Sequence, residues 1–375
     1  YYELYTKFGD VPYTTKVLSI KESMSIARTA KATVIANILA DLDEVINGNY
    51  LPTSYDADNK GRITRWAAMA IKAKIYLFEG NWTQVKNITS TIMTEGGFKL
   101  FGSYAGLFEI ANEYNSEVIL DAQYRPTSRE HQMMYVFLPP TLGGYSQLSP
   151  LQELVDSYIM LDGKTIKETG TSFDESHPYA NRDPRLKATV MYTGNSYTLA
   201  DGTEVVINCE KGEGKDGYGV GSDCSATGYY IKKYWDNAYR ATLYSGLNPI
   251  LIRYADILLM NAEALAELGE LDKTAWDATI KPIRDRAGFT LASAVEFPEG
   301  ASKDKLIEIV RNERRSELAL EGHRHKDIIR WRIADDVLNG WCHGLKTNEV
   351  VGTDNGYVRV ENRAFNANRH YLWPI

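Results

Sequence analysis

The sequence PILIRYADILLMNAEALAELG (residues 249–269), with LDKTAWDATIKPIRDRAG (271–288) directly after it, decides the fold class of this chain. Pro249 suits the start of a helix, where its missing N–H is no loss, and Gly269 suits the residue that ends one. The second segment continues with another helical pattern. Two helices joined by a short turn at glycine form a helical hairpin.

An earlier part of the chain repeats this pattern. RITRWAAMAIKAKIYLFEG (62–80) ends at a glycine, and NWTQVKNITSTIMTEGG (81–97) follows it as a partner helix. When the two terminal glycines are superposed, Ala73 aligns with Ala262. Small residues that face large ones, followed by glycine and a second helix, are typical of tetratricopeptide-type hairpins. The two copies are about 190 residues apart, so the sequence predicts separate hairpins rather than a tight tandem array.

Further helices are predicted outside these hairpins. Apolar residues at steps of three and four predict a helix over 21–47, and the pattern of 303–321 is also helical. We therefore expect a mostly α fold, in which residues 17–96 and 249–340 form a scaffold of tetratricopeptide-like helical hairpins.

The region between the hairpins, residues 97–248, has a different pattern. Turn-forming residues are dense, as in LPPTLGGYSQLSP and GEGKDGYGVGSD. One helix is predicted over 151–160, and short β-strands are predicted in three places, within 117–124, 185–192 and 228–235. A segment of this length without strong periodicity is usually functional. We therefore expect a large loop-rich subdomain with short β-strands that carries the ligand site.

The overall composition limits the possible functions. The net charge of the 375 residues is −7, which argues against a nucleic-acid binder because such proteins need a basic surface. No run of eighteen apolar residues exists, so no transmembrane helix is predicted. The chain holds 25 Tyr and 7 Trp against 10 Phe. Tyr and Trp combine a flat apolar face with a polar edge, which favours a surface on which a polar ligand stacks.

The most highly charged stretch is RNERRSELALEGHRHKDIIRW (311–331). Glu313, Glu317 and Glu321 are four residues apart and share one helix face. A di-metal centre would need a Glu-x-x-His motif on each of two helices. This chain does not offer two copies, which disfavours a metal site. The neighbouring arginines hold carboxylates ionised, which disfavours a hydrolase with paired acids. We expect these glutamates to contact arginines in a buried lattice of ion pairs, with Trp331 at a helix junction.

Other sequence patterns predict no cofactor, no metal and no catalysis. Neither a G-x-S-x-G motif, an H-E-x-x-H motif nor a phosphate-binding loop is present. DADNKG (56–61) has only part of a calcium-loop pattern, which leaves calcium as an open question. No Cys/His spacing typical of zinc exists. Cys209 and Cys224 flank a glycine-rich loop and either form a disulfide or stay free, depending on the redox compartment.

An aromatic segment, GYYIKKYWDNAYR (228–240), is the strongest candidate for ligand binding. Some aromatic residues here and in the hairpins are expected in the core instead: Tyr229, Tyr230, Trp66, Trp82 and Trp276. Later in the segment, aromatic rings are adjacent to amide, carboxylate and guanidinium groups, a combination that suits the face and hydroxyl rim of a sugar. The predicted ligand-binding residues are Trp235, Tyr239, Asp236, Asn237 and Arg240, together with Tyr218 from the glycine-rich loop.

Seven motifs are spread along the chain: FGDVPYT (8–14), SPLQELVDSYIMLDGK (149–164), RDPRL (182–186), LIRYADILLMNAEALAELG (251–269), IRDRAGF (283–289), IVRNERRSELALEGHRHKDIIRW (309–331) and YLWPI (371–375). Taken in order, they resemble the landmarks of the SusD/RagB-like lipoproteins. The resemblance extends from residue 8 to residue 375 and therefore covers nearly the whole chain.

The resemblance implies a surface-exposed outer-membrane lipoprotein of Bacteroidetes-type bacteria. Such proteins capture glycans, and sometimes peptides, for a TonB-dependent transporter of the SusC kind. Their scaffold has four tetratricopeptide-like helix pairs, and a more variable loop-rich part carries the ligand site. The family's leader, lipidated Cys and first hairpins are not found here. We therefore interpret residues 1–375 as a single SusD-like domain truncated at both ends, whose membrane contact is through a lipid anchor outside this chain.

We expect a non-enzymatic protein that binds an oligosaccharide through Trp235 and nearby tyrosines. Three alternatives stay open: a peptide-binding member of the same family, a glycoside hydrolase on a helical frame, and a scaffold that binds protein partners. The hydrolase would need two carboxylates that face an open cleft without arginine partners. Carbohydrate binding unchanged by Trp235→Ala would favour the scaffold, and binding of peptides but of no glycan would favour the peptide-binding alternative.

Overall fold

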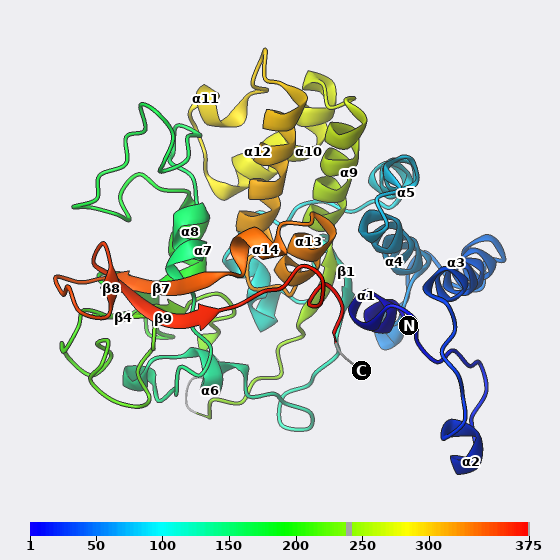
Figure 1. The fold of residues 1–375 in the computed structure, drawn as a ribbon, viewed down its shortest axis with the longest axis horizontal. Coiled ribbons are helices and arrows are strands. Elements are labelled where there is room, and N and C mark those ends of the chain that lie inside the picture. Colours follow the sequence, from blue (N-terminus) through cyan, green and yellow to red (C-terminus); the bar gives the residue numbers. More distant parts are fainter. Residues whose placement is uncertain (238–241, 374–375) are drawn as a thin grey trace.

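Helices dominate the structure, a computed structural model that describes residues 1–237 and 242–373 (Figure 1). The α-helices are α1 (Tyr2–Phe8), α2 (Ile20–Ser23), α3 (Lys31–Asn47), α4 (Arg65–Phe78), α5 (Trp82–Glu95), α6 (Met133–Phe137), α7 (Gln152–Ser157), α8 (Pro184–Thr189), α9 (Tyr254–Leu268), α10 (Lys273–Ala287), α11 (Ala292–Val295), α12 (Lys303–Glu317), α13 (Arg324–Arg330) and α14 (Ala334–Val337). The strands are β1 (Val118–Asp121), β2 (Val190–Met191), β3 (Ser196–Thr198), β4 (Glu204–Val206), β5 (Tyr230–Ile231), β6 (Ile250–Arg253), β7 (Gly340–Lys346), β8 (Thr353–Asp354) and β9 (Tyr357–Arg363).

The two predicted hairpins are confirmed as α4–α5 and α9–α10. The first helix of the second hairpin starts later than predicted at Pro249, because Ile250–Arg253 pair with β1 as strand β6 and α9 begins only at Tyr254. Side chains cap their first turns: Thr64 accepts a hydrogen bond from the Ala67 N–H at α4, and Asp272 accepts one from the Ala275 N–H at α10. Gly269 ends α9 with a φ of 74°, the left-handed conformation that glycine adopts most easily.

Helix α9 is the centre of the scaffold. One hydrophobic core joins it to α4 and α5, and a second core joins it to α10 and α12. Figure 1 shows α9, α10 and α12 side by side, with α3, α4 and α5 continuing the helical layer on one side. Trp66 and Trp276 are buried in these two cores as predicted, and Trp82 is half-buried against the first.

The loop-rich region has a core of its own. Small antiparallel sheets cover it, among them β2–β5, in which Val190 pairs with Ile231. Tyr229 and Tyr230 are buried there, as predicted. The sheet β7–β9–β8 contacts the same region through α7. This sheet follows the helical scaffold along the chain and was not predicted from the sequence.

The single helix predicted over 21–47 is wrong between Ser23, where α2 ends, and Lys31, where α3 begins. The preceding residues are held by another part of the chain. Val11 and Thr29 form an antiparallel bridge, with N···O distances of 3.3 and 2.9 Å. Asp10 then accepts a hydrogen bond from the Lys31 N–H at 2.8 Å. A long-range contact therefore sets the start of this helix.

Three other predicted elements differ from the structure in their extent. Within 185–192 the chain first forms α8, because Asp183 accepts a hydrogen bond from the Arg185 N–H and Pro184 occupies the first helical position. The strand in 228–235 is limited to β5, and the helix in 151–160 is limited to α7. Strand β1 confirms the prediction within 117–124.

The helix predicted over 303–321 ends at Glu317. Leu320 and Gly322 both have positive φ values, 63° and 81°, so the backbone leaves the helix before Glu321. The face shared by Glu313 and Glu317 therefore does not continue to Glu321 as a regular helix.

The cysteines and the helix lengths bear on two further expectations. Cys209, Cys224 and Cys342 are free thiols, so the possible disulfide between Cys209 and Cys224 is not formed. The Cys224 thiol instead donates a hydrogen bond to the Lys215 carbonyl at 3.3 Å. Within residues 1–237 and 242–373, no helix has the length and apolar character that crossing a membrane requires.

Candidate functional site

The glutamates of the most charged stretch are at the centre of a buried ion-pair lattice, as predicted. Glu317 accepts hydrogen bonds from Arg253 at 2.6 Å and from Arg185 at 2.9 Å, and it also pairs with Arg286. Glu313 pairs with Arg185 at 2.6 Å and with Arg284 at 2.8 Å. The lattice links α8, α10, α12 and β6, so it is part of the framework.

The electrostatics of the lattice are unsuited to acid catalysis. Burial alone raises the pKa of Glu317, but Arg286, Arg253 and Arg185 together bring it well below its usual range. Burial also raises the pKa of Glu321, but Arg253 and Lys233 outweigh burial and lower this pKa to about 2. These carboxylates stay ionised and paired at neutral pH, whereas a glycosidase needs one acid with a raised pKa.

Trp331 lies at a helix junction, as predicted. It directly follows α13, and its indole N–H donates a hydrogen bond to Glu263 on α9 at 2.6 Å. The Arg330 guanidinium carbon lies 4.9 Å from the centroid of its ring. Trp331 therefore joins two helices, and its side chain is largely buried.

Trp235, the main predicted stacking residue, is half-buried. Its indole N–H donates a hydrogen bond to the Thr198 carbonyl at 3.1 Å, and its ring lies 4.9 Å from that of Tyr197. It packs against the core of the loop-rich region, as does the half-buried Tyr218. Trp235 and Tyr218 therefore share a core, and each keeps only part of its ring toward solvent.

The polar residues next to Trp235 have different environments. Asp236 is buried and accepts a hydrogen bond from the Ile110 N–H at 2.8 Å, so it ties this segment to the preceding loop. Asn237 is half-buried. Tyr239 and Arg240 lie outside the described residues.

A group of half-buried and exposed tyrosines lies at α6, close to this segment. We call it the tyrosine patch, and it consists of Tyr135, Tyr145 and Tyr244. The rings of Tyr135 and Tyr145 stack with centroids 4.2 Å apart and an interplanar angle of 27°. Tyr145 and Tyr244 have exposed fractions of 40% and 45%. Flat rings that face solvent are suited to stacking against an apolar sugar face.

Backbone hydrogen bonds fix the positions of these rings. The Tyr145 N–H donates to the Tyr135 carbonyl at 2.9 Å. On the other side of α6, His131 and Ser245 form a two-way bridge, with both N···O distances at 2.9 Å. This bridge holds Tyr244, the neighbour of Ser245, next to the start of α6. The patch is therefore assembled from three separate chain segments.

Polar groups surround the rings of the patch. Gln132 donates a hydrogen bond from its side-chain amide to the Tyr244 hydroxyl at 2.8 Å. Partial desolvation, the Tyr145 hydroxyl and the negative charge of Asp223 raise the pKa of Tyr135. Amide, carboxylate and phenol groups thus lie around the aromatic faces, and all can hydrogen-bond the hydroxyls of a sugar.

The tyrosine patch and the predicted segment are neighbours. Tyr234, directly before Trp235, has its ring 6.2 Å from that of Phe137 on α6. Tyr244 meets the other end of α6 through Gln132. The predicted segment, whose role in ligand binding stays a prediction, therefore adjoins the patch, but the sequence did not predict the patch itself. Its only signal in the sequence was the turn-rich segment around Tyr145, since nothing local links this residue to Tyr244.

No metal centre accompanies this site in the part of the chain that the structure describes. There, no three His, Cys, Asp or Glu side chains gather closely enough to hold an ion. Asp56, in the segment with a partial calcium-loop pattern, instead caps a short helical turn by accepting hydrogen bonds from Asn59.

Comparison with known families agrees with the resemblance seen in the sequence. Residues 107–375 match the model of the SusD family. Residues 1–77 match a second model, described as "Starch-binding associating with outer membrane".

Two curated relatives are from Formosa agariphila. SusD-like protein P25 is 28% identical over 363 residues, which cover 90% of this chain and 62% of the relative. SusD-like protein P2 is 27% identical over 384 residues, which cover 100% of this chain and 68% of the relative.

Solved structures show the same fold. A SusD-like carbohydrate binding protein from Bacteroides fragilis has a TM-score of 0.87 and 29% identity, and the match covers 100% of this chain and 74% of that one. A laminarin binding SusD-like protein has a TM-score of 0.61 at 24% identity, with 90% of this chain and 69% of that one covered. The second likeness, at that identity, shows the fold alone.

Proposed function

This chain belongs to the SusD family, and on that premise we propose that it binds oligosaccharides without catalysis at the bacterial cell surface. The captured glycan would pass to a TonB-dependent transporter of the SusC kind in the outer membrane. The name of one structural relative, the SusD-like carbohydrate binding protein from Bacteroides fragilis, supports the class of ligand. The description of the second family model supports the outer-membrane location.

The observation that carries the proposal is the tyrosine patch. Tyr145 and Tyr244 are among the exposed large side chains of the loop-rich region. Each ring would contribute about 1–1.5 kcal/mol by stacking on a pyranose face. Gln132 and Asp223 supply amide and carboxylate partners for hydroxyl groups near the same rings. Trp235 and Tyr218 would border this site with their solvent-facing edges, and Tyr239 and Arg240 remain proposed contacts.

The lattice of ion pairs disfavours the hydrolase alternative. Glu313, Glu317 and Glu321 are all buried with basic partners. A hydrolase would need carboxylates that reach the substrate in an open cleft. We therefore propose binding for uptake, with each captured sugar held by several weak contacts.

A glycan array followed by calorimetric titration tests the proposal. We expect binding of at least one oligosaccharide by the unmodified protein, and an affinity about tenfold lower in Tyr145→Ala, because that variant loses a stacking ring. Tyr50→Ala is the matched control, since Tyr50 is an exposed tyrosine that follows α3 in the scaffold, outside the loop-rich region.

Other outcomes would contradict the proposal. Binding of peptides but of no glycan would favour the peptide-binding alternative, and sustained turnover of a glycan would favour an enzyme. An equal loss of affinity in Tyr145→Ala and Tyr50→Ala would show that the loss is not specific to the tyrosine patch. Unchanged affinity in Tyr145→Ala and in Trp235→Ala would place the glycan elsewhere on the protein.

A further inference from the structure

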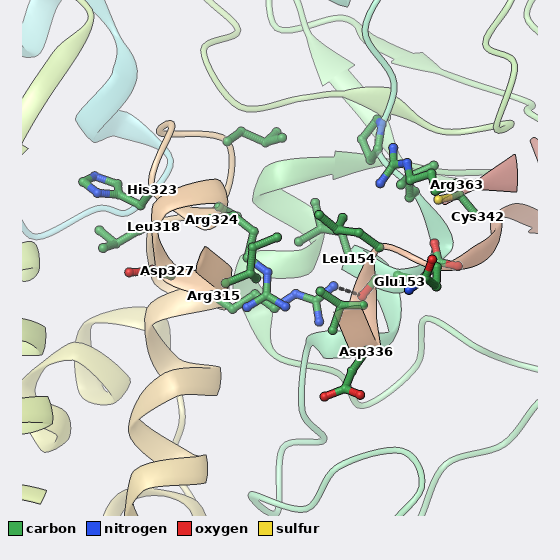
Figure 2. A pocket seen from close by; sticks show the side chains of 18 of the residues that line it. Glu153, Leu154, Arg315, Leu318, His323, Arg324, Asp327, Asp336, Cys342 and Arg363 are labelled. Carbon is green, nitrogen blue, oxygen red and sulfur yellow. Dashed lines mark hydrogen bonds between the residues drawn. The ribbon is translucent and has the colours of Figure 1, made fainter. Parts of the chain in front are cut away.

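A second feature, separate from the tyrosine patch, is a cavity of about 560 Å³. It lies among α7, the end of α12, α13, α14 and β7, and Figure 2 shows it from close by. Its volume is in the range of cavities that hold small ligands. None of the residues of the tyrosine patch lines it.

Much of the cavity wall is apolar. The larger apolar lining residues come from five separate elements or their flanks: Leu151, Leu154, Leu318, Leu320, Ile328, Val337, Leu338 and Trp341. Trp341 and Val337 are also among the exposed apolar side chains, so the wall continues to the surface. An apolar body of a ligand would therefore leave water on entering.

Two arginines, Arg315 and Arg324, are the unusual feature of this wall. Figure 2 shows both side chains extending from their helices toward the side that carries Glu153 and Leu154. Across residues 1–237 and 242–373, neither guanidinium forms an ion pair with a carboxylate. Arg315 donates a hydrogen bond to the backbone carbonyl of Glu153, and Arg324 has its guanidinium carbon 5.8 Å from the ring centroid of Trp331.

These arginines differ from those of the buried lattice. Burial and the nearby positive charge of Arg324 lower the pKa of Arg315 to about 10, and burial also lowers the pKa of Arg324. Arg253, in contrast, has carboxylate partners that raise its pKa. Glu153 acts on Arg315 and Asp327 acts on Arg324, but neither carboxylate forms an ion pair with them. Two neighbouring cations with reduced solvation and no carboxylate in direct contact favour the approach of an anion.

The acidic groups of the cavity that form direct contacts form them with other residues. Glu153 has its carboxylate bound by the N–H and the ring of His343, with a distance of 2.8 Å to the ring Nδ1. Asp327 is paired with Arg314 and Arg330. Asp336 is an exposed lining residue. On the basic side, Arg363 also lines the cavity but pairs with Glu361 at 2.9 Å.

We propose that this cavity is a binding site for a small carboxylic acid with an apolar body. The carboxylate would lie between Arg315 and Arg324, since guanidinium groups bind carboxylates through paired hydrogen bonds. The apolar body would extend along Leu154 and Leu338 toward Trp341. This site goes beyond glycan binding and does not depend on the tyrosine patch.

Calorimetric titration of the complete natural protein with three probes tests the site. Octanoate carries both the charge and the apolar body, octanamide lacks the charge, and acetate lacks the apolar body. We expect octanoate to bind, and octanamide and acetate each to bind at least about tenfold more weakly, because each loses one of the two contributions. This comparison needs no variant and is independent of any effect of a substitution on folding.

Variants then locate the binding site. Arg315→Gln and Arg324→Gln should each weaken octanoate binding by about tenfold, as expected for the loss of one charged hydrogen-bond donor. Arg332→Gln is the matched control, because Arg332 is exposed and does not line the cavity. Equal binding of octanoate and octanamide would overturn the proposal. Unchanged binding of octanoate in both cavity variants would also overturn it. The absence of octanoate binding would overturn it as well, and this would result if another part of the natural protein filled the cavity.

Discussion

Arg253 binds Glu321 through two hydrogen bonds, from Nε to Oε2 at 2.7 Å and from Nη2 to Oε1 at 2.8 Å. The same guanidinium donates from Nη1 to Glu117 at 2.7 Å and to Glu317 at 2.6 Å. Arg253 therefore connects the short β1–β6 sheet with the end of α12. One buried cation serves three buried carboxylates, and its loss would leave charges without their partner.

Arg253→Met is expected to lower the free energy of unfolding by about 3–5 kcal/mol, because removing one partner of a buried ion pair leaves the other uncompensated. Urea denaturation measures this change. Lys273→Met is the control: Lys273 forms an exposed pair with Asp277, and exposed pairs contribute about 0–1 kcal/mol. Equal stability of Arg253→Met and the unmodified protein would contradict a stabilising role of the lattice.

The pH dependence of stability should show the ionisation of Glu321. Its pKa is about 2 in the folded protein, because Arg253 and Lys233 outweigh the effect of burial. A Glu side chain in the unfolded protein has a pKa of about 4.3. A lowered folded-state pKa stabilises the protein above the unfolded pKa, and this stabilisation is lost as the pH falls toward 2. The contribution at neutral pH is on the order of 3 kcal/mol.

Glu321→Gln tests this dependence. The variant should be less stable than the unmodified protein at pH 7, and the difference should shrink as the pH falls from about 5 toward about 2. Urea denaturation at several pH values measures it. A difference that stays constant over this range would show that Glu321 does not change its protonation there.

Local signals explain which parts of the fold were predictable. Gly269 and Asp272 set the turn between α9 and α10 by conformations and caps that lie within a few residues. The start of α3 was not predictable in this way, because Thr29 pairs with Val11 and the Lys31 N–H binds Asp10. Where a boundary depends on contacts between distant residues, periodicity in one segment does not contain the information.

The same distinction applies to the candidate site. Aromatic density selected Trp235, and the structure uses part of that ring for packing against Tyr197 and for a hydrogen bond to Thr198. Tyr145 and Tyr244 are 99 residues apart in the sequence. Tyr145 contacts Tyr135 in α6, and Tyr244 contacts Gln132 directly before α6. No spacing rule connects them, so the patch became visible only in the folded chain.

The ring and the hydroxyl of Tyr244 should contribute differently to glycan affinity. Tyr244→Ala removes the stacking face and is expected to lower affinity about tenfold. Tyr244→Phe keeps the ring but loses the hydroxyl that accepts a hydrogen bond from Gln132. This exposed polar contact contributes less, so a change of about threefold or smaller is expected. Calorimetric titration with the same oligosaccharide compares the two, and equal losses would show that the hydroxyl carries the contact.

Gly322 should contribute to stability through its backbone conformation alone. Its φ is 81°, and a Cβ built at this position would meet no atom within 4 Å. Gly322→Ala is therefore expected to lower the free energy of unfolding by about 1 kcal/mol, because side chains with a Cβ disfavour the left-handed region. Gly102→Ala is the control, since Gly102 has equally open space and no positive φ. That variant should be neutral or slightly more stable, as its unfolded chain loses freedom. Urea denaturation of both variants measures the difference, and equal stabilities would contradict a backbone role for Gly322 in the turn that places Glu321 beside Arg253.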